Sequence, residues 1–237
     1  MGNMFRFKLT PSADEVEAED AKYKRNSNQK KHVVAVDLDE VLGGFLPALT
    51  IWHNRLYNTS YTLADYKSYA YCDLWGGTNE ATVIKVHQFF DSDEFRTGVR
   101  PLPNAKKTLE KFRPRCTFHV VTSRQTVISK DTLKWLELHF KGIFSDVHFG
   151  NHYDLKAPDP DSTQSGVIKR SKPDMCQDIN AVALIDDSAK YVHSFISTTK
   201  DIGSLFCCFA CLLFVSSCNK ISSTLTCLPK IYTRYEI

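Results

Sequence analysis

The sequence predicts an α/β fold built on a mostly parallel sheet. Three observations indicate it: short β-branched apolar runs recur, helical patterns with an apolar stripe separate them, and several runs end in polar residues. Parallel strands need long crossover connections, so this alternation is typical of a parallel sheet. The 237 residues, 43% of them hydrophobic and 24% charged, suit one globular domain of moderate size or a domain with an inserted subdomain.

The first half of the predicted domain contains one strand, a helical segment and a second strand. Residues 33–36 of "HVVAVDLDEVLGGF" are apolar and β-branched, which predicts a short buried strand. Residues from about 46 to 98 are rich in aromatics at helical spacing, which predicts a small helical subdomain. "PLPNAKKTLEKFRP" predicts a helix between its prolines, and "CTFHVVTSR" predicts a strand that stops at Thr122 and Ser123.

The second half repeats the alternation. "ISKDTLKWLELHF" predicts a helix with Leu133, Leu136 and Phe140 on its buried face. "SDVHFG" predicts a third strand, and "NAVALIDDS" a fourth that ends in Asp186 and Asp187.

The two ends of the chain differ from this pattern. Residues 1–31 are first acidic and then basic, which predicts a flexible polar extension. Residues 197–237 form an atypical apolar, Cys-rich tail, in which the run 202–218 is uncharged and just long enough to consider as a membrane segment. The tail is a replaced last strand, a marginal anchor or an altered terminus. The sharp change in composition favours the third, and membrane contact is disfavoured.

Charge and cysteine usage limit the partners and the compartment. The formal charge of +3, with no basic stripe, argues against a nucleic acid polymer as partner. The N-terminus lacks the apolar region of a secretory signal, so the eight cysteines are expected as reduced thiols and the protein as cytoplasmic.

Polar residues follow three of the predicted strands. Ligands bind at the carboxyl ends of the strands in an open parallel sheet, so these side chains should share one crevice. Four carboxylates there would repel one another unless a cation lay between them, and a hard, oxygen-rich site that leaves room for substrate suits Mg²⁺. The predicted residues are Asp37, Asp39, Thr122, Ser123, Asp186 and Asp187.

The same crevice has groups suited to phosphate. Thr122 offers a hydroxyl, and Ser123 lies beside it at the start of the next helix, where backbone N–H groups bind anions. "VIKRSKPDMC" adds Lys169, Arg170 and Lys172, and a lysine there provides a point charge for a phosphoryl oxygen.

These residues carry a resemblance to a known family. "VAVDLDEVLGGF", "HVVTSR", "SKPD" and "ALIDDS" resemble, in order, the four motifs of the haloacid dehalogenase (HAD) superfamily of phosphohydrolases. The resemblance spans about residues 33–195 and implies a HAD-like, Rossmann-like core at 32–196. The helical segment at about 46–98 resembles the small cap, inserted after the first strand, of the 5′(3′)-deoxyribonucleotidase-like branch.

The resemblance implies a role for each position. Asp37 would be the nucleophile that forms an aspartyl-phosphate, and Asp39 the general acid and then base. Mg²⁺ would be held by Asp37, the Asp39 backbone carbonyl and Asp186, with Asp187 beside them. Thr122 would bind the phosphoryl group, and Lys172, in a Lys-Pro pair, is preferred to Lys169 as the phosphate-binding lysine.

The expected function is thus that of a Mg²⁺-dependent HAD-type phosphatase acting on nucleotides or other small phosphorylated metabolites. The alternatives are a non-catalytic HAD-like protein that binds phosphate or a partner, and a glycosyltransferase whose DxD pair holds a metal. Glu40 stands where many relatives have Gly and is expected to point to solvent. Aromatic residues of the helical segment could stack on a nucleobase, but a core role is favoured for Trp52, Tyr66 and Trp75.

Overall fold

The computed structural model describes residues 30–152, 168–188 and 190–191. The predicted extension, apart from its last two residues, and the whole predicted tail, including the run 202–218, lie outside the described residues. In chain order the elements are β1 (His32–Val36), β2 (Gly43–Gly44), α2 (Phe45–Tyr57), η1 (Leu63–Asp65), α3 (Cys72–Trp75), α4 (Asn79–Phe90), α5 (Asp93–Gly98), β3 (Arg100–Pro101), α6 (Ala105–Phe112), β4 (Cys116–Thr122), η2 (Thr126–Ile128), α7 (Ser129–Phe140), β5 (Phe144–Phe149), α8 (Lys172–Asp178) and β6 (Ala183–Ile185).

The main sheet has the strand order β5-β4-β1-β6, and all three neighbouring pairs are parallel. Strand β1 lies between β4 and β6, so the first strand of the chain is central. Parallel pairing requires long crossover connections. Helices α2 to α6 lie between β1 and β4, α7 between β4 and β5, and α8 between β5 and β6. The predicted α/β fold class is therefore confirmed.

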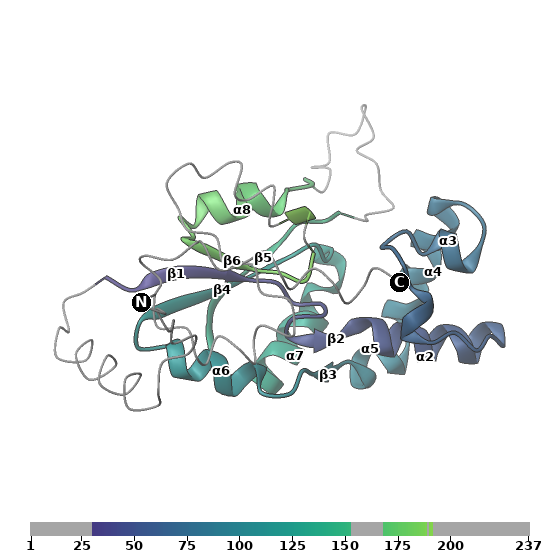
Figure 1. Cartoon of the computed structure of the whole chain (residues 1–237), viewed down its shortest axis with the longest axis horizontal. Helices are drawn as coiled ribbons and strands as arrows, with labels where there is room; N and C mark the ends of the chain where they lie inside the picture. Colours follow the sequence, from purple (N-terminus) through teal and green to yellow (C-terminus); the bar gives the residue numbers. More distant parts are fainter. Residues whose placement is uncertain (1–29, 153–167, 189, 192–237) are drawn as a thin grey trace, which may run out of the picture.

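Helices cover both faces of this sheet, α8 on one side and α6 and α7 on the other (Figure 1). Successive β1 residues alternate between two cores: Val34 and Val36 belong to the larger core with α6 and α7, and Ala35 to a smaller one with α8. Alternation with burial on both faces explains why β1 is a continuous apolar run.

One predicted buried position on α7 is wrong. Leu136 and Phe140 are buried as expected, but Leu133 is 49% exposed. The buried face is centred on Thr132, Trp135 and Leu136, and Leu133 lies at its edge.

A helical segment is inserted between the two strands of a small antiparallel ribbon. Gly44 pairs with Arg100 and Gly43 with Pro101, and helices α2 to α5 lie between these partners in the chain. The chain thus enters and leaves the segment side by side. A Cβ on Gly43 would lie 2.8 Å from the Trp135 ring of α7, so a larger residue at position 43 would displace that ring.

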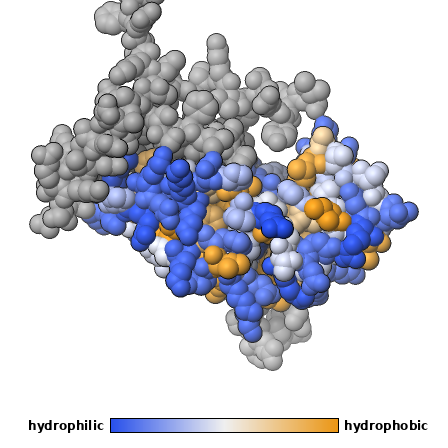
Figure 2. Space-filling view, turned by 90° about the horizontal axis from the view of Figure 1, so that it is seen from below, coloured by the Kyte–Doolittle hydropathy of each residue, from blue (hydrophilic) through white to orange (hydrophobic). Residues whose placement is uncertain are grey.

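The surface seen from below in Figure 2 is mainly hydrophilic, with small, separate apolar areas. Within the described ranges, no helix combines the length and the apolar composition needed to cross a membrane.

Candidate active site

Three neighbouring strands bring the predicted motif residues to one edge of the sheet. Val36 pairs with Val120 of β4 and Ile185 of β6, so the chain leaves all three strands at the same end. Asp37 follows β1 directly, and its backbone N–H donates to the Ile185 carbonyl at 2.8 Å. The local sequence therefore fixes Asp37 at the rigid end of the central strand.

Three carboxylates form a compact group at this edge. Asp37, Asp186 and Asp187 each offer an oxygen, and these oxygens all lie within 4.8 Å of one another. Burial, with the nearby charges of Asp186 and Asp39, raises the pKa of Asp37 to about 7 although Lys172 opposes the shift. Burial and the charge of Asp37 raise the pKa of Asp187 to about 6. The raised pKa values indicate that nearby positive charge does not fully compensate the negative charge of these three carboxylates.

Lys172 is the cation inside this group. It lies at the first position of α8, where the Ser171 hydroxyl accepts from the Asp174 N–H and Pro173 suits the first turn. Its Nζ lies 2.8 Å from an oxygen of Asp37 and 2.6 Å from one of Asp186, and the side chain is buried. Burial favours the neutral amine, but the two carboxylates outweigh it and raise the pKa of Lys172.

The residues present fit a divalent metal ion. One buried ammonium faces three carboxylates, which leaves two negative charges without a partner in the group. Clustered carboxylate oxygens are the ligands of hard divalent cations such as Mg²⁺. Burial and mutual repulsion raise the pKa values of Asp37 and Asp187, and a cation between these carboxylates would oppose both effects.

The other predicted phosphate-binding residues lie in different surroundings. Thr122 is buried at the end of β4, and its Oγ1 accepts from the Arg124 backbone N–H at 3.2 Å. The Ser123 hydroxyl lies 3.4 Å from Nδ1 of His152 and 3.5 Å from the Tyr191 hydroxyl. Lys169 is exposed, whereas Lys172 lies among the carboxylates.

The side chain of Asp39 is held apart from the three carboxylates by Arg124. Nε and Nη2 of Arg124 donate to the two Asp39 oxygens at 3.0 and 2.7 Å, and Nη1 donates to Thr132 Oγ1 at 3.0 Å. A bidentate arginine–carboxylate pair fixes both distance and orientation. Arg124 was not among the predicted site residues, although it directly follows the Thr122-Ser123 motif.

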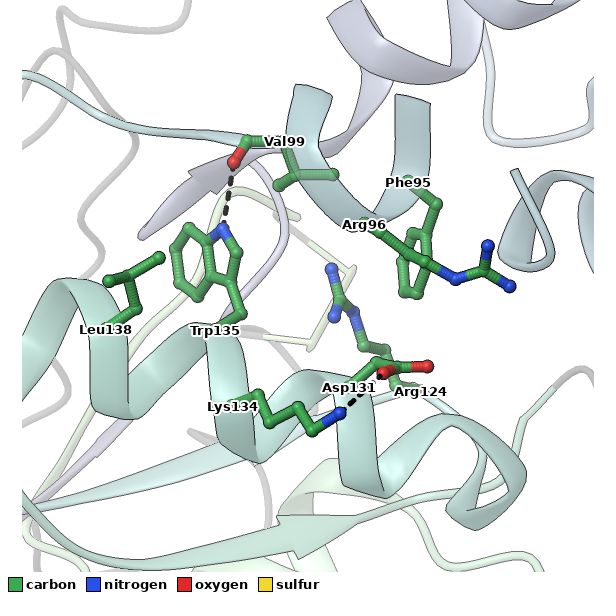
Figure 3. Close-up of a pocket in the computed structure, with 8 residues that line it drawn as sticks. All are labelled: Phe95, Arg96, Val99, Arg124, Asp131, Lys134, Trp135 and Leu138. Atoms are coloured by element: carbon green, nitrogen blue, oxygen red, sulfur yellow. Dashed lines mark hydrogen bonds and ion pairs between the residues drawn. The ribbon is translucent and has the colours of Figure 1, made fainter. Parts of the chain in front are cut away.

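Arg124 also forms a wall of a cavity of about 230 Å³ between α5 and α7 (Figure 3). In this view its guanidinium extends between Phe95 and Trp135. The cavity is lined by Phe95, Arg96, Val99, Arg124, Asp131, Lys134, Trp135 and Leu138. None of the three clustered carboxylates lines it, so the cavity lies behind Arg124 rather than at the site itself.

The expectation that Glu40 points to solvent is wrong. Its backbone has a left-handed φ of 59°, and its Oε1 accepts from the Leu46 N–H at 2.7 Å, at the start of α2. An anion is favoured at a helix N-terminus, which explains why the Glu40 side chain points toward the start of α2 rather than to solvent. Burial nevertheless raises the pKa of Glu40 to about 7.

A residue of the inserted segment reaches the carboxylates, and sequence reasoning missed it. The Tyr69 hydroxyl donates to Asp187 Oδ2 at 2.6 Å, although 118 residues separate the two. Tyr69 as a whole is 59% exposed. Desolvation of its hydroxyl and the charge of Asp187 nevertheless raise the pKa of Tyr69, so its phenol keeps the proton that it donates. No local pattern marks Tyr69 among the many aromatics of the segment.

The aromatic residues considered for base stacking mostly contact one another. Trp52 is 3% exposed and packs against Phe89, with ring centroids 5.6 Å apart. Trp75 stacks on His53 at 4.3 Å, and its Nε1 donates to the Tyr66 hydroxyl at 3.3 Å. The core alternative therefore holds for Trp52, while Tyr66 and Trp75 are half-buried.

Comparisons with solved structures show the same fold. A haloacid dehalogenase-like family hydrolase from Streptococcus pneumoniae matches with a TM-score of 0.51 and 15% identity, covering 74% of this chain and 84% of that one. A protein from Lactobacillus plantarum, described as a phosphoglycolate phosphatase, gives 0.52 and 12%, covering 75% and 86%. A protein from Bacteroides fragilis, described as a haloacid dehalogenase-like hydrolase, gives 0.50 and 15%, covering 75% and 86%.

The search of curated proteins finds no match. A family model does match: that of the 5′ nucleotidase, deoxy (pyrimidine), cytosolic type C protein (NT5C), over residues 31–154. This range is more than half of the 237 residues and includes the Asp37, Asp39 and Thr122 motifs, while Lys172 and Asp186-Asp187 follow it. The chain therefore belongs to the NT5C family, a nucleotidase-like branch of the HAD phosphohydrolases, and is an enzyme of the HAD phosphatase type.

Proposed function

We propose that the protein is a Mg²⁺-dependent phosphomonoesterase that forms an aspartyl-phosphate on Asp37. The observation that supports this most is the buried group of Asp37, Asp186 and Asp187 with Lys172 inside it. Such a concentration of charge is costly for folding, and it is suited to a doubly charged cation and a phosphoryl group. A cation bound there would neutralise phosphoryl oxygens and keep Asp37 ionised.

In the first half-reaction an oxygen of Asp37 attacks phosphorus, and the bond to the leaving oxygen breaks. Lys172 contacts both Asp37 and Asp186, so its ammonium lies where it would bind an oxygen of the group under attack. Thr122, at the neighbouring strand end, is proposed to bind a second phosphoryl oxygen, with Ser123 and the more distant Lys169 as weaker candidates.

Asp39 is proposed to carry the proton between the two half-reactions. It gives a proton to the leaving oxygen, then takes one from the water that attacks phosphorus and releases phosphate from Asp37. Both Asp39 oxygens accept from Arg124, so the proton that Asp39 donates must be carried on a lone pair that Arg124 does not use. Arg124 is thus proposed to hold Asp39 in place between steps.

The substrate is proposed to be a nucleoside 5′-monophosphate, because the name of the matching family indicates deoxypyrimidine nucleotides. The segment of residues 45–99 is proposed to act as the cap that covers the substrate. Its Tyr69 already donates to Asp187, so a cap residue lies beside the proposed metal ligands.

The test is hydrolysis of an aryl phosphate by the purified full chain, with Mg²⁺ or with a chelator, for the wild type and Asp37→Asn. We expect turnover that needs Mg²⁺ and is absent in the variant, followed by preference for deoxypyrimidine monophosphates over sugar phosphates in a panel. A folded wild type that binds phosphate without turnover would refute the proposal in favour of the non-catalytic alternative. Hydrolysis of sugar nucleotides alone would favour the glycosyltransferase.

A further inference from the structure

A second group of metal-binding side chains lies on strands β4 and β5, outside the active site. His119, Asp146 and His148 each offer a ligand atom, and these atoms all lie within 4.8 Å of one another. Nδ1 of His119 is 3.3 Å from Nε2 of His148, and Oδ2 of Asp146 is 3.8 Å from the same Nε2. The proposed reaction uses none of the three.

An irregularity in the strand pairing brings the three residues onto one face. Phe118 pairs with Phe144, but His119 pairs with Asp146, so Ser145 is an extra residue in β5. Without this bulge Ser145 would face His119, and Asp146 and His148 would point to the other side of the sheet. The bulge is therefore what makes a three-residue group possible.

The spacing of the two nitrogens matches shared coordination to one ion. Zinc–nitrogen bonds of about 2.0–2.1 Å at a tetrahedral angle place two imidazole nitrogens about 3.3 Å apart. The observed separation is 3.3 Å. A direct imidazole hydrogen bond gives a similar distance, and Asp146 can also pair with a protonated His148. The feature that favours a metal is that all three ligand atoms lie within 4.8 Å of one another.

The Asp146 carboxylate is oriented for a ligand role. Its Oδ1 accepts from the Val147 backbone N–H at 2.8 Å, which leaves Oδ2 as the oxygen nearest the histidines. A supporting hydrogen bond of this kind commonly fixes the direction of a metal-binding side chain. The Asp146 side chain is 66% exposed, so the group is open to ions from solution.

We propose that His119, His148 and Asp146 form a second metal site, which binds Zn²⁺ or a similar transition-metal ion. Two imidazoles and one carboxylate favour transition metals, whereas the carboxylates at Asp37 favour Mg²⁺. The two sites therefore select different ions. A metal here joins β4 to β5, the edge strand of the described sheet, and stabilises that pairing.

The test is titration of the metal-free full chain with Zn²⁺ and with Co²⁺ in saturating Mg²⁺, which occupies the carboxylate site. We expect one bound ion, a Co²⁺ spectrum typical of nitrogen ligands and a melting temperature raised by Zn²⁺. His119→Gln and His148→Gln should weaken binding at least about tenfold, while His139→Gln, on α7, should not change it. All three variants should keep the Mg²⁺-dependent hydrolysis.

Equal Zn²⁺ affinity in the wild type and both histidine variants would refute the site, because binding would then involve other groups such as the cysteines. The absence of Zn²⁺ binding to the wild type would refute it as well. If the variants do not fold, the wild type alone can be tested by modifying its histidines with diethyl pyrocarbonate. Bound Zn²⁺ should protect His119 and His148 from this modification, but not His139. Unchanged modification of all three would refute the proposal and leave the phosphatase proposal intact.

Discussion

The carboxyl group of Asp37 should lower the stability of the metal-free protein, and Asp37→Asn should remove this cost. Its pKa is raised from 3.8 to about 7, first of all by burial. Between these values the folded state keeps a proton that the unfolded state has lost, so stability falls as the pH rises from about 4 to 7. Three pKa units correspond to about 4 kcal/mol. This shift already includes the opposing attraction of Lys172. The neutral Asn resembles the protonated carboxyl group, so we expect the variant to gain about 2–4 kcal/mol at pH 8.

The assay is guanidinium unfolding of both proteins at pH 4 and pH 8, with chelator and then with Mg²⁺. The variant should be more stable than the wild type only at pH 8 without metal. At pH 4 the Asp37 carboxyl group of the folded wild type is protonated and has no such cost, and with Mg²⁺ the ion stabilises the wild type through the same carboxylate. The raised pKa of Glu40 has no contribution from Asp37, so Glu40 contributes equally to both proteins. The charge of Asp37 raises the pKa of Asp187, so the variant also relieves part of the cost at Asp187 and adds to the expected gain.

The matched control is the same substitution two residues away. Asp39→Asn leaves the buried guanidinium of Arg124 without its charged partner, so we expect a loss of about 2–3 kcal/mol at pH 8. If Asp37→Asn also destabilises the metal-free protein at pH 8, the claim that burial and mutual repulsion strain this group is refuted.

Three further substitutions test single contacts. Lys172→Met leaves Asp37 and Asp186 buried without their cation, so we expect the free energy of unfolding to fall by about 3–5 kcal/mol. Denaturant unfolding in the presence of chelator measures this, and an unchanged midpoint would contradict it. Tyr69→Phe removes only the hydrogen bond to Asp187, so the free energy of unfolding should change by about 1 kcal/mol or less. Steady-state kinetics should show an altered kcat/KM, and an unaltered value would exclude a role of Tyr69 at the site. Gly43→Ala brings a methyl group to 2.8 Å from the Trp135 ring, so thermal unfolding should show a loss of stability of about 1–3 kcal/mol from the clash. Gly142→Ala is the control without a clash, because its new methyl group meets no atom within 4 Å and its strain comes from backbone conformation alone.

The strands and their polar ends could be predicted because their signals are local. Residues 33–36 are β-branched and apolar, and the strand they form ends where Asp37 begins. Parallel pairing then brings the ends of β1, β4 and β6 together without further information. This is why the amino-acid sequence alone predicts Asp37, Asp186 and Asp187 at one edge of the sheet.

The contacts that were missed depend on long-range packing or on unusual backbone conformation. Arg124 and Asp39 are 85 residues apart, and Tyr69 and Asp187 are 118 apart, so neither pair leaves a periodic pattern. Glu40 accepts from the Leu46 N–H out of a backbone with positive φ, a conformation that is uncommon for a residue other than glycine. The bulge that aligns Asp146 with His119 is equally invisible in the alternation of residue types.

The short ribbon of β2 and β3 has a consequence for how this enzyme could diversify. Because Gly44 and Arg100 are hydrogen-bonded neighbours, residues 45–99 leave and rejoin the core at a single place. Another stretch of similar end-to-end spacing could join the same two points, provided that its apolar residues fill the core that Phe45, Leu49 and Phe95 now share with Val36. If the segment acts as the proposed cap, a replacement would have to reproduce its links to the site. These include the Tyr69 hydrogen bond to Asp187, the Leu46 N–H bond to Glu40 and the Phe95 ring beside Arg124.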